Sequence, residues 1–147
     1  ENWLFHNSTH VIDLAFHLGG KPKDISCYTA GALNWHPASS IFAGAGASDR
    51  GALFSYNANW ESPGRWGVEV LTRKHRLIFR PLEKLQIQKI GSIAVELLDI
   101  DDRLDVEYKP GLFKQTQAFI NGDTQHLCTI EEQANMVNLY NKIANYP

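Results

Sequence analysis

The strict alternation of residue types between Ala52 and Glu61 constrains the fold of this chain more than any other feature. Every second residue from Ala52 to Trp60 is apolar or aromatic, and the residues between them are mostly polar. Because successive side chains of a strand point to opposite faces, this pattern predicts a β-strand with one apolar face. Ser62, Pro63 and Gly64 follow, and such residues are typical of a turn.

Shorter alternating runs follow at residues 66–70, 77–80 and 84–88. A parallel crossover needs a dozen or more residues, so the short connections between these runs predict antiparallel neighbours. Together with the first run they predict a meander of at least four strands.

The region before residue 52 is expected to contain one strand and one loop. Residues 24–33 include the β-formers Ile25, Tyr28 and Thr29, and they predict a strand. Residues 34–50 hold a proline, serines and a run of small residues, and we expect a long loop or an irregular edge there.

Three helices are expected beside the strands. Ser8 and Thr9 are good N-cap residues, and apolar residues then recur at helical spacing before Gly19 and Gly20 end the run. A second helix is expected over residues 111–120. A third runs over residues 129–144 and opens with a capping box, because a glutamate follows Thr129 by three residues.

These elements predict an α+β fold, namely an open, predominantly antiparallel β-sheet with helices packed on one face. A chain of 147 residues, 44% hydrophobic and 20% charged, is expected to form a single domain over residues 1–147. If each helix has one apolar stripe, the helices cover only one face of the sheet. The other face is then expected to mediate self-association, most simply as a dimer. It would carry Leu53, Asn57, Asn59, Glu69, Leu71, Arg76 and Ile78.

Charge and composition exclude several kinds of partner. The formal net charge is -2 and there is no block of Lys or Arg, so we expect no nucleic-acid partner. No apolar run approaches the roughly 20 residues of a membrane span. Cys27 and Cys128 are far apart, and we expect two reduced, buried thiols in a cytoplasmic protein.

The residues best suited to chemistry lie in the first predicted helix. His10 and Asp13 are three residues apart and share a helix face, and a carboxylate can orient an imidazole for proton transfer. His6 and His17 are spaced from His10 by four and seven residues, which leaves a zinc or iron site as an alternative, although His6 precedes the expected N-cap. An ordinary buried His–Asp hydrogen bond beside a capping and a surface histidine is equally compatible with the spacing.

The run Gly44–Ser48 is only superficially like a dinucleotide-binding loop. It lacks a third glycine at the required position, and a predicted strand follows it in place of a helix. We therefore expect no cofactor to bind here.

The runs His10–Ala15 and Leu18–Pro22 resemble the opening helix of the second domain in the glucose–fructose oxidoreductase / inositol dehydrogenase (Gfo/Idh/MocA) family. The order of elements is also similar, with a helix, an open sheet and then two helices, as are the segments Pro63–Val70 and Gly111–Phe113. The resemblance covers nearly the whole chain.

The resemblance implies an NAD(P)-dependent oxidoreductase in which an N-terminal Rossmann domain binds the cofactor and supplies a catalytic lysine. The second domain of such enzymes contacts the substrate and dimerises through its sheet. His10 matches the family's proton-transfer histidine, and Asp13 matches the aspartate that follows it. His6 stands where the family usually has an aspartate, which is a departure from the standard acid–base pair. The expected catalytic residues are therefore His10 and His6, and Asp13 is expected to bind substrate.

A Rossmann domain and its lysine are absent from residues 1–147. We therefore expect NAD or NADP to be bound by another domain and this chain alone to be inactive. Its expected function is that of a substrate-binding and dimerising C-terminal domain acting on a sugar or sugar-derived compound. The alternative is a stand-alone binding or dimerisation module without catalysis.

Overall fold

The computed structural model describes residues 3–36, 38–125 and 127–146 and shows an α+β chain with two antiparallel sheets. The elements are α1 (Trp3–Asn7), α2 (Thr9–Gly19), β1 (Pro22–Ala30), β2 (Ile41–Ser48), β3 (Leu53–Asn59), β4 (Val68–Leu71), β5 (His75–Phe79), β6 (Leu85–Lys89), β7 (Glu96–Leu97), α3 (Arg103–Glu107), α4 (Leu112–Asn121) and α5 (Ile130–Ala144). The expected α+β class is confirmed, and the expectation of one continuous sheet is wrong.

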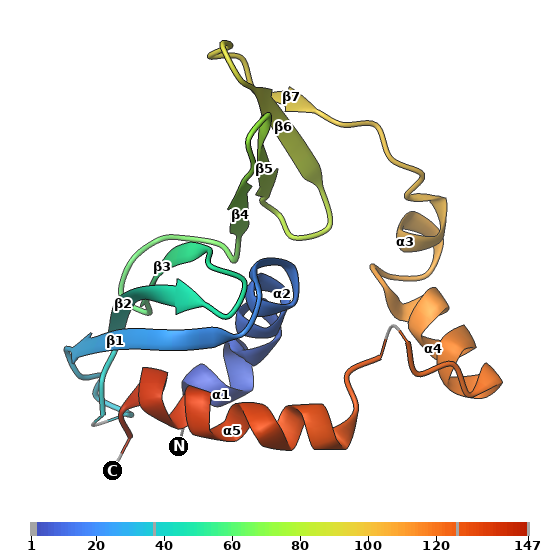
Figure 1. Ribbon diagram of the computed structural model, residues 1–147. Helices are drawn as coiled ribbons and strands as arrows, with labels where there is room; N and C mark the ends of the chain where they lie inside the picture. Colours follow the sequence, from blue (N-terminus) through green and yellow to red (C-terminus); the bar gives the residue numbers. More distant parts are fainter. Residues whose placement is uncertain (1–2, 37, 126, 147) are drawn as a thin grey trace.

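The first sheet has three strands in the order β1-β2-β3, and its packed face lies against α1, α2 and α5 (Figure 1). Phe16 of α2 meets Phe54 of β3 edge to face, with ring centroids 5.1 Å apart. The alternation that predicted this strand is present in the structure, because Phe54, Tyr56 and Ala58 are half-buried while Leu53, Ser55 and Asn57 are exposed. The apolar face of the alternating run therefore packs against the helices, as expected.

Strand β2 corrects the expectation of a loop over residues 34–50. Gly44 and Gly46 lie in the centre of the sheet, paired on one side with β1 and on the other with β3. A Cβ at Gly44 would lie 2.5 Å from the Tyr56 ring, and one at Gly46 would lie 2.8 Å from the Phe54 ring. The small residues therefore let aromatic rings of β3 lie across the central strand, which is a use of strand glycine that local sequence does not reveal.

The hydrophobic core joins the two ends of the chain. Trp3 and Leu4 of α1 pack with Phe42 of β2 and with Ile143 and Ala144 of α5. Both described ends of the chain accordingly lie close together beside the first sheet (Figure 1).

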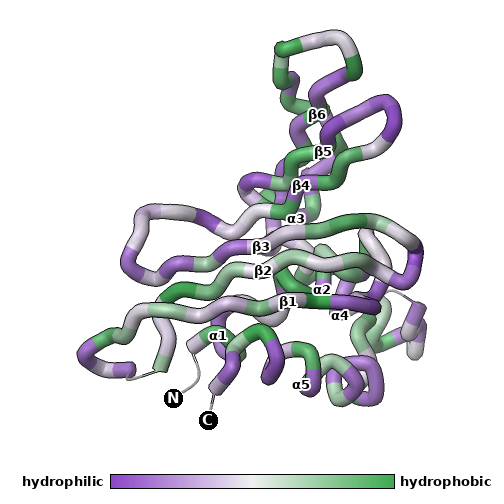
Figure 2. The backbone as a smooth tube through the Cα atoms, turned by 60° about the vertical axis from the view of Figure 1, so that its left-hand side comes forward, coloured by the Kyte–Doolittle hydropathy of each residue, from purple (hydrophilic) through white to green (hydrophobic). Residues whose placement is uncertain are grey.

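The second sheet has four strands in sequence order, β4-β5-β6-β7, each antiparallel to the next. Its strands project away from the first sheet, as the view in Figure 2 also shows. The predicted meander of short antiparallel strands is thus confirmed for β4, β5 and β6, whereas β3 pairs with β2 and belongs to the other sheet. The chain turns directly after β3, where the Ser62 N–H donates to the Asn59 carbonyl at 3.4 Å, so the turn lies over residues 59–62 and not at the expected residues 62–64.

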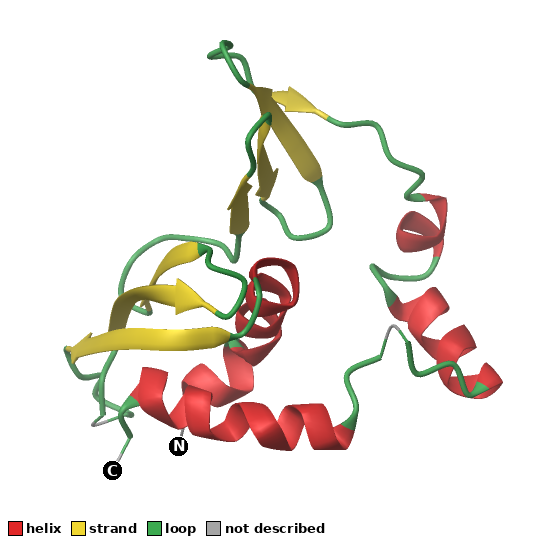
Figure 3. Cartoon of the chain, in the orientation of Figure 1, coloured by secondary structure: helices red, strands yellow, loops and turns green. Residues whose placement is uncertain are grey.

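Helix α5 forms as expected, and helix α4 forms without packing on a sheet. Thr129 accepts a hydrogen bond from the Glu132 backbone N–H and its own N–H donates to the Glu132 carboxylate, so the predicted capping box is confirmed. Helix α4 ends at Gly122, which adopts the left-handed conformation with φ 67°. The expectation that every helix covers the sheet is wrong, because α3 and α4 stand apart from both sheets (Figure 3).

Two further expectations concern the burial of the two cysteine thiols and the presence of a membrane-spanning helix. Both cysteines are free, but Cys27 is half-buried and Cys128 is exposed, so the expectation of two buried thiols is wrong for Cys128. In the part of the chain that the structure describes, no helix combines the length and the apolar character that a membrane crossing requires.

Candidate functional site

Helix α2 carries the predicted proton-transfer histidine on its exposed side. The helix begins at Thr9 after Ser8, whose side chain makes no capping hydrogen bond. It stops at Gly20, which has φ 94° and donates its N–H to the Phe16 carbonyl. Since a positive φ of this kind favours glycine, the predicted glycine stop is confirmed. His10 is one residue into this helix and is exposed.

The neighbour of His10 is a tryptophan that lies far away in the sequence. The imidazole of His10 and the indole of Trp66 meet edge to face, with ring centroids 4.4 Å apart and an interplanar angle of 87°. Trp66 lies in the loop just before β4 and is 45% exposed. The arrangement places an ionisable ring and a flat apolar surface together in contact with solvent.

Asp13, the expected partner of His10, is engaged elsewhere. Its carboxylate accepts a hydrogen bond from the hydroxyl of Tyr140, a residue of α5 that is only 3% exposed. Gln133 donates a second hydrogen bond, of 3.0 Å, to the same hydroxyl. Asp13 therefore ties α2 to α5, and this tie fixes the orientation of the helix that carries His10.

The hydrogen bond between Tyr140 and Asp13 predicts a response to alkaline pH. Burial, and then the Asp13 carboxylate, raise the pKa of Tyr140 above its ordinary value of 10.0. A raised pKa means that the folded state prefers the neutral phenol. The stabilisation is therefore complete below pH 10 and is lost as the pH rises through the folded-state pKa.

We expect Tyr140→Phe to lower the free energy of unfolding at neutral pH by about 1–3 kcal/mol, because Asp13 loses its partner. The variant should also lose less stability than the wild type between pH 8 and pH 11. Urea unfolding at both pH values measures the two effects. Tyr28→Phe is the control, because Tyr28 is 70% exposed and its removal should change neither quantity. An unchanged alkaline loss in Tyr140→Phe would show that Asp13 and Tyr140 are not coupled.

His6 and His17 lie on either side of His10 along the chain, in α1 and in the last turn of α2. His6 is helical, contrary to expectation, but it belongs to α1, which ends at Asn7 before α2 begins. His17 lies in the last turn of α2, at the end that faces Glu132 of α5. Over residues 3–36, 38–125 and 127–146 no group of three or more His, Cys, Asp or Glu side chains could hold a metal ion. The alternative of a zinc or iron site gains no support.

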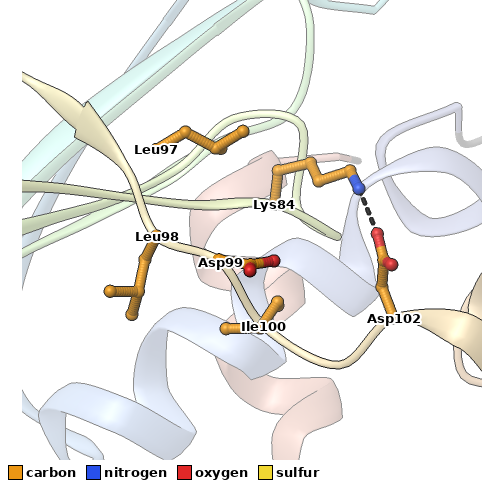
Figure 4. Close-up of a pocket in the computed structure, with 6 residues that line it drawn as sticks. All are labelled: Lys84, Leu97, Leu98, Asp99, Ile100 and Asp102. Carbon is orange, nitrogen blue, oxygen red and sulfur yellow. Dashed lines mark hydrogen bonds and ion pairs between the residues drawn. The ribbon is translucent and has the colours of Figure 1, made fainter.

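A cavity lies where the chain leaves β7, beside the start of β6 (Figure 4). It has a volume of about 250 Å³ and is lined by Lys84, Leu97, Leu98, Asp99, Ile100 and Asp102. Lys84 and Asp102 form an ion pair across it, and the hydrogen bond to Asp102 raises the pKa of Lys84. The Lys84 ammonium group already has the Asp102 carboxylate as its partner. This cavity is therefore a weaker candidate for a ligand site than the surface around His10.

Sequence reasoning missed Trp66 and Tyr140 as parts of the site. Nothing local indicates that Trp66 meets His10, because the contact depends on how α2 packs against the start of β4. Tyr140 offered a weak signal, since a phenol on the buried stripe of a helix needs a hydrogen-bond partner.

Comparison of the chain with protein-family models, with curated proteins and with solved structures finds no match. The function of the site has to be inferred from its own residues.

Proposed function

We propose that this chain is the substrate-binding and self-associating part of an NAD(P)-dependent oxidoreductase that acts on a sugar or a sugar-derived compound. The observation that carries the proposal is the exposed His10–Trp66 pair. An imidazole can take the proton of a substrate hydroxyl group while the carbon that bears this hydroxyl gives a hydride to the nicotinamide. The exposed indole offers a surface for the apolar face of a sugar ring. The resemblance of the segment His10–Pro22 to the Gfo/Idh/MocA family supports the same assignment.

Asp13 acts in this proposal as a positioning residue. Its carboxylate bonds to Tyr140, so it holds α2 against α5 and thereby sets the place of His10. Asp13 remains half-buried, and direct contact with a substrate hydroxyl is compatible with that exposure. His6 is exposed on α1 and is the weaker candidate for a role in proton transfer.

The nicotinamide cofactor, when bound, accepts or donates the hydride. The residues of this chain do not fit its phosphates, because Gly44 and Gly46 lie within strand β2 and their open sides are filled by Tyr56 and Phe54. A pyrophosphate needs free backbone N–H groups at the start of a helix, and those of a central strand are engaged in the sheet. The proposal therefore assigns cofactor binding to a separate nucleotide-binding domain.

We expect the isolated chain to bind polyols or sugars weakly and NADH or NADPH not at all. Proton NMR titration with inositol and glucose should shift the ring signals of His10 and Trp66. Titration with NADH should produce no energy transfer from the four tryptophans to the nicotinamide.

The control for the sugar titration is Trp35→Leu, because Trp35 is exposed but lies next to His36 and Trp60 instead of His10. This variant should respond like the wild type, whereas Trp66→Leu should lose the response. A micromolar NADH isotherm would contradict the assignment of the cofactor to another domain. If adding sugar shifts other protein signals but leaves the ring signals of His10 unchanged, the placement of the site is contradicted.

Self-association is proposed through the sheet faces that carry no helix. The residues expected there fall on two sheets. In the second sheet Leu71 stands opposite Arg76 and Glu69 opposite Ile78, so these four do share a face. Leu53, Asn57 and Asn59 share the outer face of the first sheet. The mixture of apolar and polar side chains is typical of a protein–protein interface.

A stand-alone binding or dimerisation module is the second candidate function. It is favoured by the amount of apolar side chain that the chain leaves exposed, including Leu53 at 87% and Leu71 at 78%. Oxidation of a sugar by the protein together with its nucleotide-binding domain would separate the two, because a pure module has no turnover.

A further inference from the structure

The surface area of this chain is much larger than that of a compact monomer. The solvent-accessible area is 10704 Å², whereas a compact monomer of 16.6 kDa exposes about 7,600 Å². The excess is roughly 3,000 Å². A standard protein–protein interface buries only about 800 Å² per partner, and obligate dimers bury about 1,000–2,500 Å² per partner. The chain therefore exposes enough surface for an extensive dimer interface.

One part of this surface is a continuous apolar sheet face. In the second sheet Val68 pairs with Phe79 and Phe79 with Leu85, while Val70 pairs with Leu77 and Leu77 with Ile87. Directly paired residues point to the same side, so all six are on one face. Val68 is buried at the contact with α2, and the other five are only half-buried. In the described chain no helix makes an extended contact with β5 or β6.

The other part is an apolar helix face on the segment that we call the helical arm, residues 103–121. Leu112, Phe113 and Ile120 of α4 line an open groove of about 380 Å³ together with Tyr108. Phe119 is 77% exposed and Ile120 is 75% exposed. The helix LFKQTQAFIN contains one charged residue, Lys114, on the side away from this stripe.

These two surfaces are chemically complementary. A sheet face and an amphipathic helix each need an apolar partner, and together they form the usual two-layer arrangement. Neither surface has a charged residue at its centre, and the cores of protein–protein interfaces are likewise poor in charged residues. The nearest charges on the sheet are Lys89 and Glu96 at its margin, and they pair with each other at 3.5 Å.

The two surfaces do not meet within one chain, although the helical arm is attached at both ends. At one end the Lys84–Asp102 ion pair, together with the 2.8 Å hydrogen bond from Leu98 N–H to the Leu85 carbonyl, ties the chain to the base of the sheet (Figure 4). At the other end the capping box at Thr129 fixes the start of α5, whose last turn packs in the core. Between these two attachments the arm stands clear of the sheet (Figure 1).

We propose that the chain forms a dimer by arm exchange, in which α4 of each copy lies on the apolar face of the β4–β7 sheet of a second copy. This rests on the self-association part of the proposed function, but in the second sheet it assigns the contact to the face opposite the one that carries Leu71 and Arg76, as a rival to association through that mixed face. Two equivalent contacts related by a two-fold axis bury both apolar surfaces of both copies.

The first test is the dissociation constant of the dimer, measured by light scattering over a wide concentration range. Phe119→Glu should raise it at least roughly 30-fold, because it replaces an apolar side chain of the arm that is 77% exposed by a charge that the apolar sheet face cannot pair. Lys114→Glu is the matched control, since it places the same residue on the opposite side of α4 and should change the constant little. Leu71→Glu tests the other face of the sheet.

The outcomes separate the two ideas about association. Loss of the dimer in Phe119→Glu alone supports arm exchange. Loss in Leu71→Glu alone overturns arm exchange and leaves association through the mixed face in place. A monomer at every concentration in the wild type overturns both.

The second test distinguishes exchange between copies from closure within one copy. Cys27 and Cys128 are replaced by serine, and two separate variants then carry Ile120→Cys on α4 or Ile87→Cys on the sheet. When the two variants are mixed, a short bismaleimide should link one to the other and give a product of twice the chain mass. Either variant alone should give this product in lower yield. A third variant carries both Ile120→Cys and Ile87→Cys. A link formed only inside this variant as a monomer, or no link at all, would overturn the proposal.

Discussion

Replacing His10 by alanine is expected to lower the turnover of the proposed oxidoreductase, assembled with the proposed nucleotide-binding domain, by about 10²–10⁴-fold. The imidazole is the group proposed to take the substrate proton, and it is exposed beside Trp66 where a substrate can reach it. Because this chain does not hold the cofactor in the proposal, affinity for NAD(P) should stay nearly unchanged. Steady-state rates, with turnover separated from both Michaelis constants, measure these effects.

The control for His10→Ala is His17→Ala on the same helix. His17 is exposed in the last turn of α2, two turns away, so its loss should leave turnover near the wild-type value. Circular dichroism should show both variants folded, since neither side chain is buried. Wild-type turnover in His10→Ala would show that His10 has no catalytic role and is an ordinary surface histidine beside a tryptophan.

Replacing Gly44 by valine is expected to lower the free energy of unfolding by about 3 kcal/mol. A Cβ at this position would lie 2.5 Å from the Ser26 carbonyl oxygen and 2.5 Å from the Tyr56 ring, and the backbone atom cannot move aside without breaking the β1–β2 pairing. Urea unfolding followed by tryptophan fluorescence gives the change.

Ala45→Val is the matched control for the glycine variant. Ala45 is the next residue of β2 and is exposed on the opposite face of the sheet. Valine there has room and suits a strand, so stability should change by no more than about 0.5 kcal/mol. Equal destabilisation by the two variants would mean that the Tyr56 ring does not lie over Gly44.

The elements that local sequence specifies were predictable. The capping box at Thr129 depends on Glu132 three residues away, and the alternation along β3 depends on one strand alone. Strand β2 was not predictable in the same way, because Gly44 is required by Tyr56, a residue of the neighbouring strand. The separation into two sheets also depends on contacts between distant segments, since β3 could pair with either β2 or β4 by pattern alone.

For the candidate site, the sequence placed His10 in the first helix, and the structure has it in α2, where it is exposed. The expected His10–Asp13 pairing does not follow from a shared face, because Tyr140 of α5 competes for the carboxylate and binds it. Trp66 could be found only once the packing of α2 against β4 was known. Helical spacing thus identifies which residues can meet, and tertiary packing decides which of them do.

The core that joins Trp3 and Leu4 to Ile143 and Ala144 has a consequence for folding during synthesis. Ribosomes add roughly 5–20 residues per second, so the α1 side of the core waits on the order of ten seconds for its α5 partner to be made. Throughout that interval the inner faces of β1, β2 and β3 have no complete cover, and the aromatic rings of β3 are open to other nascent chains. Contacts of such high sequence separation also form slowly. Until α5 is made, the exposed inner face of the first sheet is therefore the part of the nascent chain most open to wrong contacts.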